Sequence, residues 1–250
     1  MQGNAMVLPQ NEFLEVDRIT LAYGKQAVLQ DLTLSLPAGE FIGLVGPNGA
    51  GKTTLLLGLS GQFKPLRGNI RFQQKDIYKE NLLYKEKIGY VHERPFIYSF
   101  LSVEEYLYVV ATLKHITASR IDDEINRVLD HVCLADERNK PGSDLSMGMQ
   151  KKLVIASAMI GNPELVFLDE ALNGIDIESA YRIKSVLRDY VSNGGTVVLS
   201  THTLEVVEKI CSRYVIMKKG ALVADIDAGL FRRQQNVDLE NYIMNLLGKK

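Results

Sequence analysis

Cysteine, net charge and long apolar runs are all scarce in this sequence. Only two cysteines occur in 250 residues, Cys133 and Cys211, and they share no metal-binding spacing, so we expect free thiols in a reducing compartment. The net charge of −1 gives no electrostatic basis for binding nucleic acid. No apolar run approaches the roughly 20 residues that a membrane-spanning helix requires. The sequence therefore predicts a cytoplasmic protein with no nucleic-acid partner and no membrane span.

The rest of the composition is that of a folded globular protein. Hydrophobic residues make up 46% of the chain and charged residues 24%, and a chain of 250 residues can bury a substantial core. This length fits one large α/β domain or two small ones. The first residues, MQGNAMVLPQNE, lack the basic flank and the apolar core of a signal peptide. We expect residues 1–11 to form a flexible tail.

The stretch Gly46–Thr54, GPNGAGKTT, matches the pattern G-x-x-x-x-G-K-[ST]. It follows Phe41–Val45, an apolar run typical of a buried strand, and leads into Lys52–Leu59, whose residues favour a helix. Glycines in such a loop let successive backbone N–H groups surround phosphate oxygens, because no Cβ intervenes. Lys52 can reach the outer phosphates, and the Thr53 hydroxyl can ligate Mg²⁺. The loop therefore predicts a binding site for a nucleoside triphosphate.

Two runs before this loop predict an antiparallel β layer. Glu12–Ala22 is rich in strand formers, and Val28–Leu36 alternates apolar and polar residues in its second half. Tyr23 lies in the predicted loop between them. A loop tyrosine is more often a half-buried surface residue, but a flat ring shortly before a phosphate loop can also stack on a base.

Later runs predict a mixed order of strands and helices. Strands are expected at Gly68–Phe72, Ile88–Val91, Leu165–Leu168, Gly195–Leu199, Tyr214–Met217 and Leu222–Asp225, and the second and third of these are typical of buried strands. Between the second and third of these strands the apolar spacing is helical, which predicts an all-helical insertion over about residues 95–159. Helices are also expected at Gln150–Ile160, Asp176–Val191 and Val237–Leu247, and Lys79–Lys87 is either a short helix or a loop.

Three further segments carry polar residues where elements begin or end. Ser146 in LSMGM precedes a helix; it is a good N-cap whose neighbouring amides can bind an anion, although a helix cap without a ligand is commoner. Asp169 and Glu170 end a buried strand, where two acids pack poorly but suit a Mg²⁺ site. His202 follows the next strand, and a lone histidine there is more often structural than catalytic.

In the order GPNGAGKTT, LSMGM, LVFLDE, NGID and STH, these motifs resemble the ATP-binding cassette of ABC transporters over about residues 12–226. The resemblance implies an α/β fold, a P-loop NTPase core with an antiparallel β layer and an all-helical insertion, followed by a short helical tail at 227–250. It is greatest to bacterial export-type (ABC-2-like) subunits. The implied function is ATP hydrolysis that powers transport through separate membrane subunits, at the inner face of the cell membrane. The residues leave open a soluble cassette ATPase, such as one for iron–sulphur cluster assembly, and a non-hydrolysing nucleotide switch.

The resemblance also implies a role for each site residue. Tyr23 would stack on adenine, Thr53 and Asp169 would hold Mg²⁺, Glu170 would be the general base, and His202 would contact the γ-phosphate and the water. The phosphate-binding loop would consist of Gly46, Pro47, Asn48, Gly49, Ala50, Gly51, Lys52, Thr53 and Thr54. Two ATPase subunits would pair head to tail, so that Ser146 and Gly148 of one chain cap the nucleotide of the other and Asp176 crosses the interface.

Three motifs depart from the family pattern, at four positions. Met147 and Met149 replace a glycine and the glutamine of the usual LSGGQ, although the two residues nearest phosphate are retained. Glu93 stands where a glutamine usually touches Mg²⁺, and Ala171 replaces a common proline. We expect the signature to function and Glu93 to act as a Mg²⁺ ligand.

Overall fold

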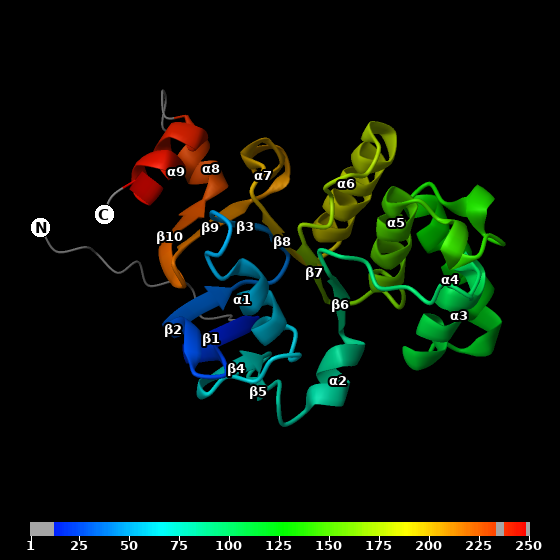
Figure 1. The fold of residues 1–250 in the computed structure, drawn as a ribbon, viewed down its shortest axis with the longest axis horizontal. Coiled ribbons are helices and arrows are strands. Elements are labelled where there is room, and N and C mark those ends of the chain that lie inside the picture. Colours follow the sequence, from blue (N-terminus) through cyan, green and yellow to red (C-terminus); the bar gives the residue numbers. More distant parts are fainter. Residues whose placement is uncertain (1–12, 234–237, 249–250) are drawn as a thin grey trace, which may run out of the picture.

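The computed structural model describes residues 13–233 and 238–248. The tail expected at 1–11 and the first residue of the predicted last helix, Val237, lie outside these ranges. Two β-sheets stack on each other, and a group of helices extends from one end of them (Figure 1). In the described part of the chain no helix combines the length and the apolar character needed to cross a membrane.

The first sheet is antiparallel and has the strand order β2-β1-β4-β5. Its strands are β1 (Leu14–Tyr23), β2 (Gln26–Leu36), β4 (Arg67–Phe72) and β5 (Lys75–Asp76). The antiparallel layer predicted from the first two runs is therefore present. Tyr23 was predicted to lie in a loop, and this was wrong: it is the last residue of β1 and pairs with Gln26 across a tight turn at Gly24, whose φ is 59°. The turn is shorter than the loop predicted from the sequence, because a glycine accepts the left-handed conformation that a tight turn requires.

The second sheet has the order β10-β9-β3-β8-β7-β6 and is parallel except at β10. Its strands are β3 (Phe41–Val45), β6 (Ile88–Val91), β7 (Leu165–Asp169), β8 (Thr196–Thr201), β9 (Arg213–Lys218) and β10 (Ala221–Asp227). The parallel strands end at one edge, so the loops after β3, β6, β7 and β8 all meet there. In an open α/β sheet this edge is where ligands bind.

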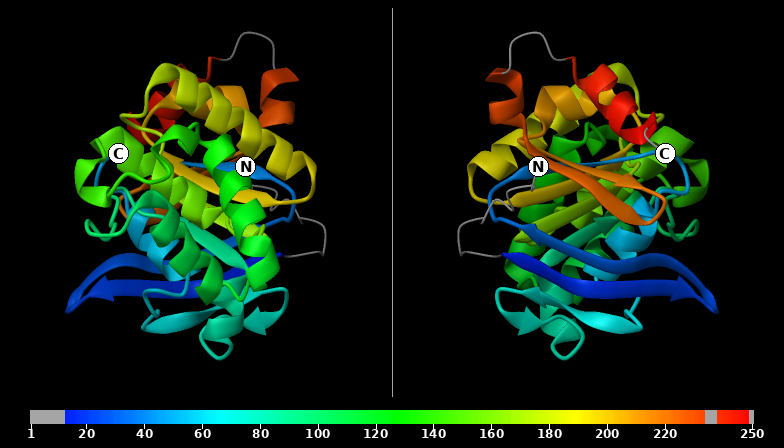
Figure 2. Two further views of the ribbon diagram at one scale, coloured as in Figure 1. Left: turned by 90° about the vertical axis from the view of Figure 1, so that its right-hand side faces the viewer. Right: turned by 90° about the vertical axis from the view of Figure 1, so that its left-hand side faces the viewer.

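Helix α1 (Lys52–Leu59) lies between the two sheets, and α5 (Met147–Ala158) and α6 (Ile177–Ser192) pack on the opposite face of the parallel sheet (Figure 2). Residues Leu165–Leu168 of strand β7 are all apolar because the strand is buried on both faces. Leu165 and Phe167 join the apolar cluster shared with α1 and the antiparallel sheet, while Val166 and Leu168 join the cluster formed with the helices. A strand buried on both faces needs a continuous apolar run, and this run is what the sequence shows.

The described residues between β6 and β7 form helices and loops but no strand. They comprise α3 (Val103–Leu113), α4 (Ala118–His131), two short 3-10 turns and α5 (Met147–Ala158). A capping box fixes the start of α3: the Ser102 hydroxyl accepts from the Glu105 N–H, and the Glu105 carboxylate accepts from the Ser102 N–H. Helix α5 begins three residues before the predicted Gln150, because Ser146 caps it directly.

The helices outside the insertion are α2 (Asn81–Glu86), α6 (Ile177–Ser192), α7 (Leu204–Ile210), α8 (Ala228–Arg233) and α9 (Leu239–Gly248). Of these, α7 and α8 were not predicted, and neither was β5. Each is too short to show a clear period in the sequence. Helix α7 forms because Val207 and Ile210 pack on the parallel sheet. Its formation therefore depends on tertiary contacts rather than on the local sequence.

Candidate functional site

The glycine loop connects β3 to α1 at the carboxyl edge of the parallel sheet (Figure 1). Gly51 has a φ of 99°, and a Cβ there would lie 2.6 Å from the Leu29 side chain. A Cβ on Gly46 would collide with the Met217 carbonyl. Gly51 is therefore required by conformation and by space, and Gly46 by space. The loop consequently carries bare backbone N–H groups at the N-terminus of a helix, which is where anions bind.

Lys52 turns its ammonium group back into this loop. Its Nζ donates to the carbonyl oxygens of Gly46 at 2.7 Å and Pro47 at 3.3 Å, and it lies 4.0 Å from Glu170 Oε1. Burial lowers the pKa of Lys52, although the Glu170 and Asp169 carboxylates oppose this effect. A buried ammonium whose nearest carboxylate oxygen is 4.0 Å away favours an anionic ligand such as a phosphate group.

The two acids at the end of β7 have different surroundings. Asp169 is buried, and its Oδ1 accepts a hydrogen bond from Ser200 Oγ at 2.5 Å. Glu170 has a φ of 48°, and its Oε2 accepts from Asn173 Nδ2 at 2.8 Å and lies 3.1 Å from His202 Nδ1. The structure therefore brings Glu170 and His202 together, as their positions after neighbouring strands imply. Sequence reasoning missed Ser200 and Asn173, whose side chains hold the two carboxylates.

An open cavity of about 570 Å³ joins these groups. Its lining includes Lys52 and Thr53, Glu93 with Arg94, Glu170, His202 and Met147. The predicted residues Tyr23, Gly46, Pro47, Asp169, Ser146, Gly148 and Asp176 lie outside this lining. The cavity thus brings the glycine loop, Glu170 and His202 together in one place, as a site for a nucleoside triphosphate requires.

The metal ligands predicted from the sequence are the Thr53 hydroxyl and the Asp169 and Glu93 carboxylates. Among residues 13–233 and 238–248, no three His, Cys, Asp or Glu side chains converge closely enough to hold a metal ion. The donors still fit Mg²⁺, because this ion is usually held by one or two carboxylates and a hydroxyl, with phosphates and water completing its shell. Thr53 is exposed at the start of α1, and Asp169 lies at the end of the neighbouring strand β7.

The start of α5 lies against the loop that follows Glu170. Ser146 Oγ accepts from the Met149 N–H at 3.3 Å, so it caps the helix, and Met147 is exposed. Asp176 caps α6 by accepting from the Ser179 N–H at 2.8 Å, which lowers the pKa of the Asp176 carboxyl. Both caps have a structural role in this chain, and both stay exposed to solvent.

Tyr23 contacts an aromatic residue that sequence reasoning did not single out. Its ring stacks on Phe63 with centroids 4.9 Å apart and an interplanar angle of 24°. The side chain is 53% exposed. One ring face is therefore covered, and the exposed surface is available for a base.

We expect Tyr23→Ala to weaken ATP binding by only about 1–2 kcal/mol, the size of one lost stacking contact. Equilibrium titration of purified wild type and variant with a fluorescent ATP analogue measures this change. Tyr181→Ala, which removes an exposed tyrosine of α6, is a matched control that should leave affinity unchanged. Equal ATP affinity for wild type and Tyr23→Ala would exclude the stacking role.

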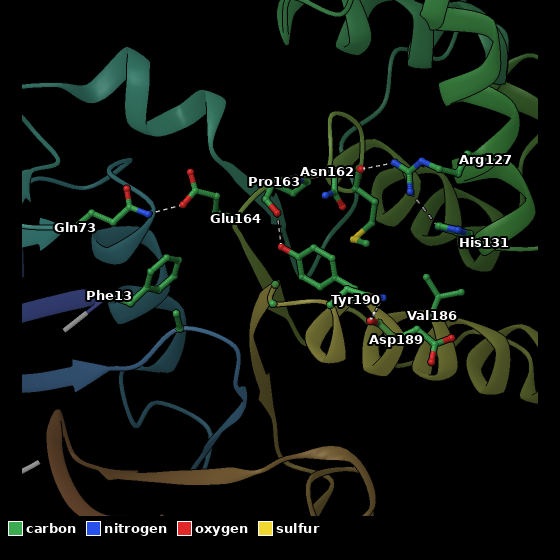
Figure 3. A pocket seen from close by; sticks show the side chains of 15 residues that line it. Phe13, Gln73, Arg127, His131, Asn162, Pro163, Glu164, Val186, Asp189 and Tyr190 are labelled. Carbon is green, nitrogen blue, oxygen red and sulfur yellow. Dashed lines mark hydrogen bonds between the residues drawn. The ribbon is translucent and has the colours of Figure 1, made fainter. Parts of the chain in front are cut away.

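A second cavity, of about 600 Å³, lies at the opposite edge of the parallel sheet, between α4, α6 and the loop before β7 (Figure 3). Several of its polar side chains are already engaged. Arg127 binds the Glu124 carboxylate and the Met159 carbonyl, and the Tyr190 hydroxyl donates to the Pro163 carbonyl. Because its cation is paired within the protein, this cavity has no free charge for phosphate and is not the nucleotide site.

Comparison with known proteins agrees with this geometry. A family model described as "ABC transporter" matches residues 29–173. An uncharacterized ABC transporter ATP-binding protein of Nostoc sp. is 37% identical over 80% of this chain and 59% of that protein. The lantibiotic transport ATP-binding protein SrtF of Streptococcus pyogenes is 30% identical over 85% and 90% of the two chains. The bacitracin transport ATP-binding protein BcrA of Enterococcus faecalis is 35% identical over 86% and 69%.

Solved structures show the same fold. An ATP-binding subunit of an ABC transporter superposes with a TM-score of 0.87 at 27% identity, covering 94% of this chain and 99% of that one. A dimeric cassette bound to ADP and Pi in a post-hydrolysis state has a TM-score of 0.80 at 22% identity, covering 86% and 98%, and so supports the fold alone.

The fold and the site define a P-loop nucleotide-binding cassette, which confirms the predicted fold class. The chain belongs to the ABC transporter family. It is an ATP-binding subunit of that family, whose cassettes are ATPases, and none of the relatives named above supports the iron–sulphur alternative.

Proposed function

We propose that this chain hydrolyses ATP as the subunit of an export-type transporter and powers transport through separate membrane subunits. The convergence of Lys52, Glu170 and His202 on one cavity beside the glycine loop carries the proposal. SrtF and BcrA are named for lantibiotic and bacitracin transport, which supports an export role. The direct test of the catalytic part is Mg²⁺-dependent release of phosphate from ATP by the purified chain.

In this mechanism the backbone N–H groups of the glycine loop bind the phosphates. Lys52 exchanges its bonds to the loop carbonyls for the outer phosphate oxygens, which compensates the burial of its charge. Glu170 orients the attacking water and accepts its proton, while His202 stabilises the charge that develops on the γ-phosphate. Mg²⁺, when bound at Thr53 and Asp169, neutralises phosphate charge.

A phosphate loop covers only one side of the nucleotide, so a second set of donors is needed on the other side. We propose that Ser146 and Gly148 at the start of α5 supply these donors to the nucleotide of a second, head-to-tail subunit, with ATP between the two chains. Met147 is 62% exposed and lines the cavity, so the start of α5 is accessible for such a contact. Asp176, 60% exposed as a side chain, would lie at the same interface.

We predict that Glu93 acts as the Mg²⁺-sensing residue in place of the usual glutamine. A carboxylate offers the metal a full negative charge, whereas an amide offers one neutral oxygen. Glu93→Gln should therefore retain ATPase activity but require more Mg²⁺ for half-maximal turnover, and Glu93→Ala should lose more, chiefly in turnover stimulated by the membrane partner. Titrating turnover with Mg²⁺ checks this.

The competing interpretation of Glu93 is a surface ion pair with Arg94, worth less than about 1 kcal/mol. In the described residues no ion pair joins these two side chains, and both line the nucleotide cavity. Glu80→Gln, at an exposed surface ion pair with Lys75, is the matched control and should not change the titration. Identical Mg²⁺ curves for wild type, Glu93→Gln and Glu93→Ala would show that Glu93 never meets the metal.

We predict that the membrane partner docks on the segment Pro95–Leu101. The interpretation in which its aromatic side chains pack inside the insertion is weakened, because Phe96, Tyr98 and Phe100 are all exposed. The Tyr98 ring contacts both phenylalanines, with centroids 5.6 Å from Phe96 and 5.9 Å from Phe100. They form an apolar surface suited to an amphipathic helix of the membrane subunit.

A photo-crosslinking residue placed at Tyr98 or Phe100 tests this docking site. In complexes purified from detergent-solubilised membranes, it should crosslink to an integral membrane protein, while the same residue at the exposed Leu230 should not. Crosslinks from Tyr98 and Phe100 that stay within this chain would instead place the rings inside the insertion. Failure to co-purify with any membrane protein would favour the soluble cassette ATPase.

A further inference from the structure

The carboxylate of Glu170 is held asymmetrically. Both hydrogen-bonding neighbours act on Oε2: the Asn173 amide at 2.8 Å and the His202 ring nitrogen at 3.1 Å. The other oxygen, Oε1, is the one that faces Lys52 Nζ, at 4.0 Å. The side chain is only 11% exposed, so these contacts rather than bulk water decide its orientation.

The backbone places Asn173 at this carboxylate. Glu170 adopts a left-handed conformation, which turns the chain sharply after β7, and the Asn173 N–H donates to the Glu170 carbonyl at 3.4 Å. Gly174 is also left-handed, with a φ of 76°, and the turn ends where Asp176 caps α6. A left-handed residue other than glycine is unfavourable, so the surrounding contacts must enforce this turn.

The same turn is fixed to the first turns of α5. Lys151 Nζ donates to the Asn173 carbonyl at 2.6 Å. A Cβ on Gly148 would lie 3.1 Å from the Gly174 carbonyl, so the helix and the turn are in close contact. Lys152 reaches Ser179 Oγ at 2.9 Å at the start of α6. A shift of the α5 N-terminus would therefore displace Asn173.

We propose that Asn173 is a positioning residue for Glu170, and that Lys151 fixes Asn173 to α5. The Asn173 amide holds Glu170 Oε2 by a hydrogen bond and leaves Oε1 directed toward Lys52 and the phosphates. Oε1 is then the oxygen that meets the attacking water. When His202 turns to the γ-phosphate, Asn173 is the described donor that stays on Oε2. Without it, the carboxylate can rotate toward Lys52 and shorten the 4.0 Å ion pair that already joins the two side chains. The inference rests on the proposed role of Glu170.

Two substitutions at one position separate positioning from loop shape. Asn173→Ala removes the donor, and we expect kcat for ATP to fall about 10- to 100-fold, the effect of losing a hydrogen bond to a charged group, with little change in KM. Asn173→Asp keeps the shape but sets a second carboxylate against Glu170, so it should lose more than Asn173→Ala. Both variants should still form the ATP-bound dimer in gel filtration.

The outcomes are distinct. Asn193→Ala, which removes an amide donor at the far end of α6, is the matched control and should keep wild-type kcat. Wild-type kcat in both Asn173 variants would overturn the proposal. Loss of ATP-dependent dimerisation, or Asn173→Asp more active than Asn173→Ala, would show a role in loop shape only. If Glu170→Gln itself kept full turnover, the proposed function would fail, whatever the Asn173 variants did.

The link to α5 is tested by a double-mutant cycle. Lys151→Met keeps the length of the side chain but removes its donor, and we expect a kcat a few-fold lower than wild type. In the double variant Lys151→Met/Asn173→Ala, kcat should match that of Asn173→Ala alone, because both act through one contact with Glu170. Multiplicative losses in the double variant would show that Lys151 acts independently and would overturn this link.

Discussion

Glu170→Gln is expected to slow ATP hydrolysis by several orders of magnitude while ATP binding is retained. The amide keeps the size of the side chain but cannot accept the proton of the attacking water, so the chemical step loses its base. The geometry supports binding without turnover, because the glycine loop and the hydrogen bonds of Lys52 to its carbonyls do not involve Glu170. Phosphate release and nucleotide titration, measured on the same sample, separate the two effects.

With hydrolysis blocked, ATP and Mg²⁺ should accumulate the dimer of Glu170→Gln in gel filtration. Glu164→Gln is the matched control, since Glu164 precedes β7 at the other edge of the sheet and pairs with Lys87 at the surface. It should hydrolyse ATP at the wild-type rate. Near-wild-type turnover by Glu170→Gln, with only monomer present, would exclude both the base assignment and the dimer.

The fold followed from the sequence where local pattern and packing agree. Helix α1 has the predicted bounds because it starts directly after the glycine loop and buries Leu55, Leu56 and Leu59, and β6 has the predicted bounds because it is a short apolar strand buried on both faces. The pattern gave no signal for α7, which forms only because two of its side chains reach the sheet. Short elements of this kind depend on partners that are distant in sequence.

Some residues of the candidate site could likewise be predicted from the sequence, and others could not. Lys52, Glu170 and His202 could be predicted because each follows a strand of one parallel sheet, and such strands end at a common edge. Asn173 could not be predicted, since its contact depends on the left-handed turn at Glu170, and nothing in the residue itself demands that conformation. Ser200 was missed because its hydroxyl acts across two strands, at Asp169.

Lys52→Ala is expected to weaken ATP binding by at least about tenfold and to abolish measurable turnover. The buried ammonium is the cation nearest the loop, and a hydrogen bond from a charged donor contributes about 1.5–3 kcal/mol. Lys52→Arg should not restore activity, because the planar guanidinium does not fit the position where Nζ meets the Gly46 and Pro47 carbonyls. Lys209→Ala, an exposed lysine of α7, should behave as wild type in the same binding and phosphate-release assays. Turnover by Lys52→Ala at more than a few per cent of wild type would mean that the phosphates are held elsewhere, and the glycine loop would lose its assigned role.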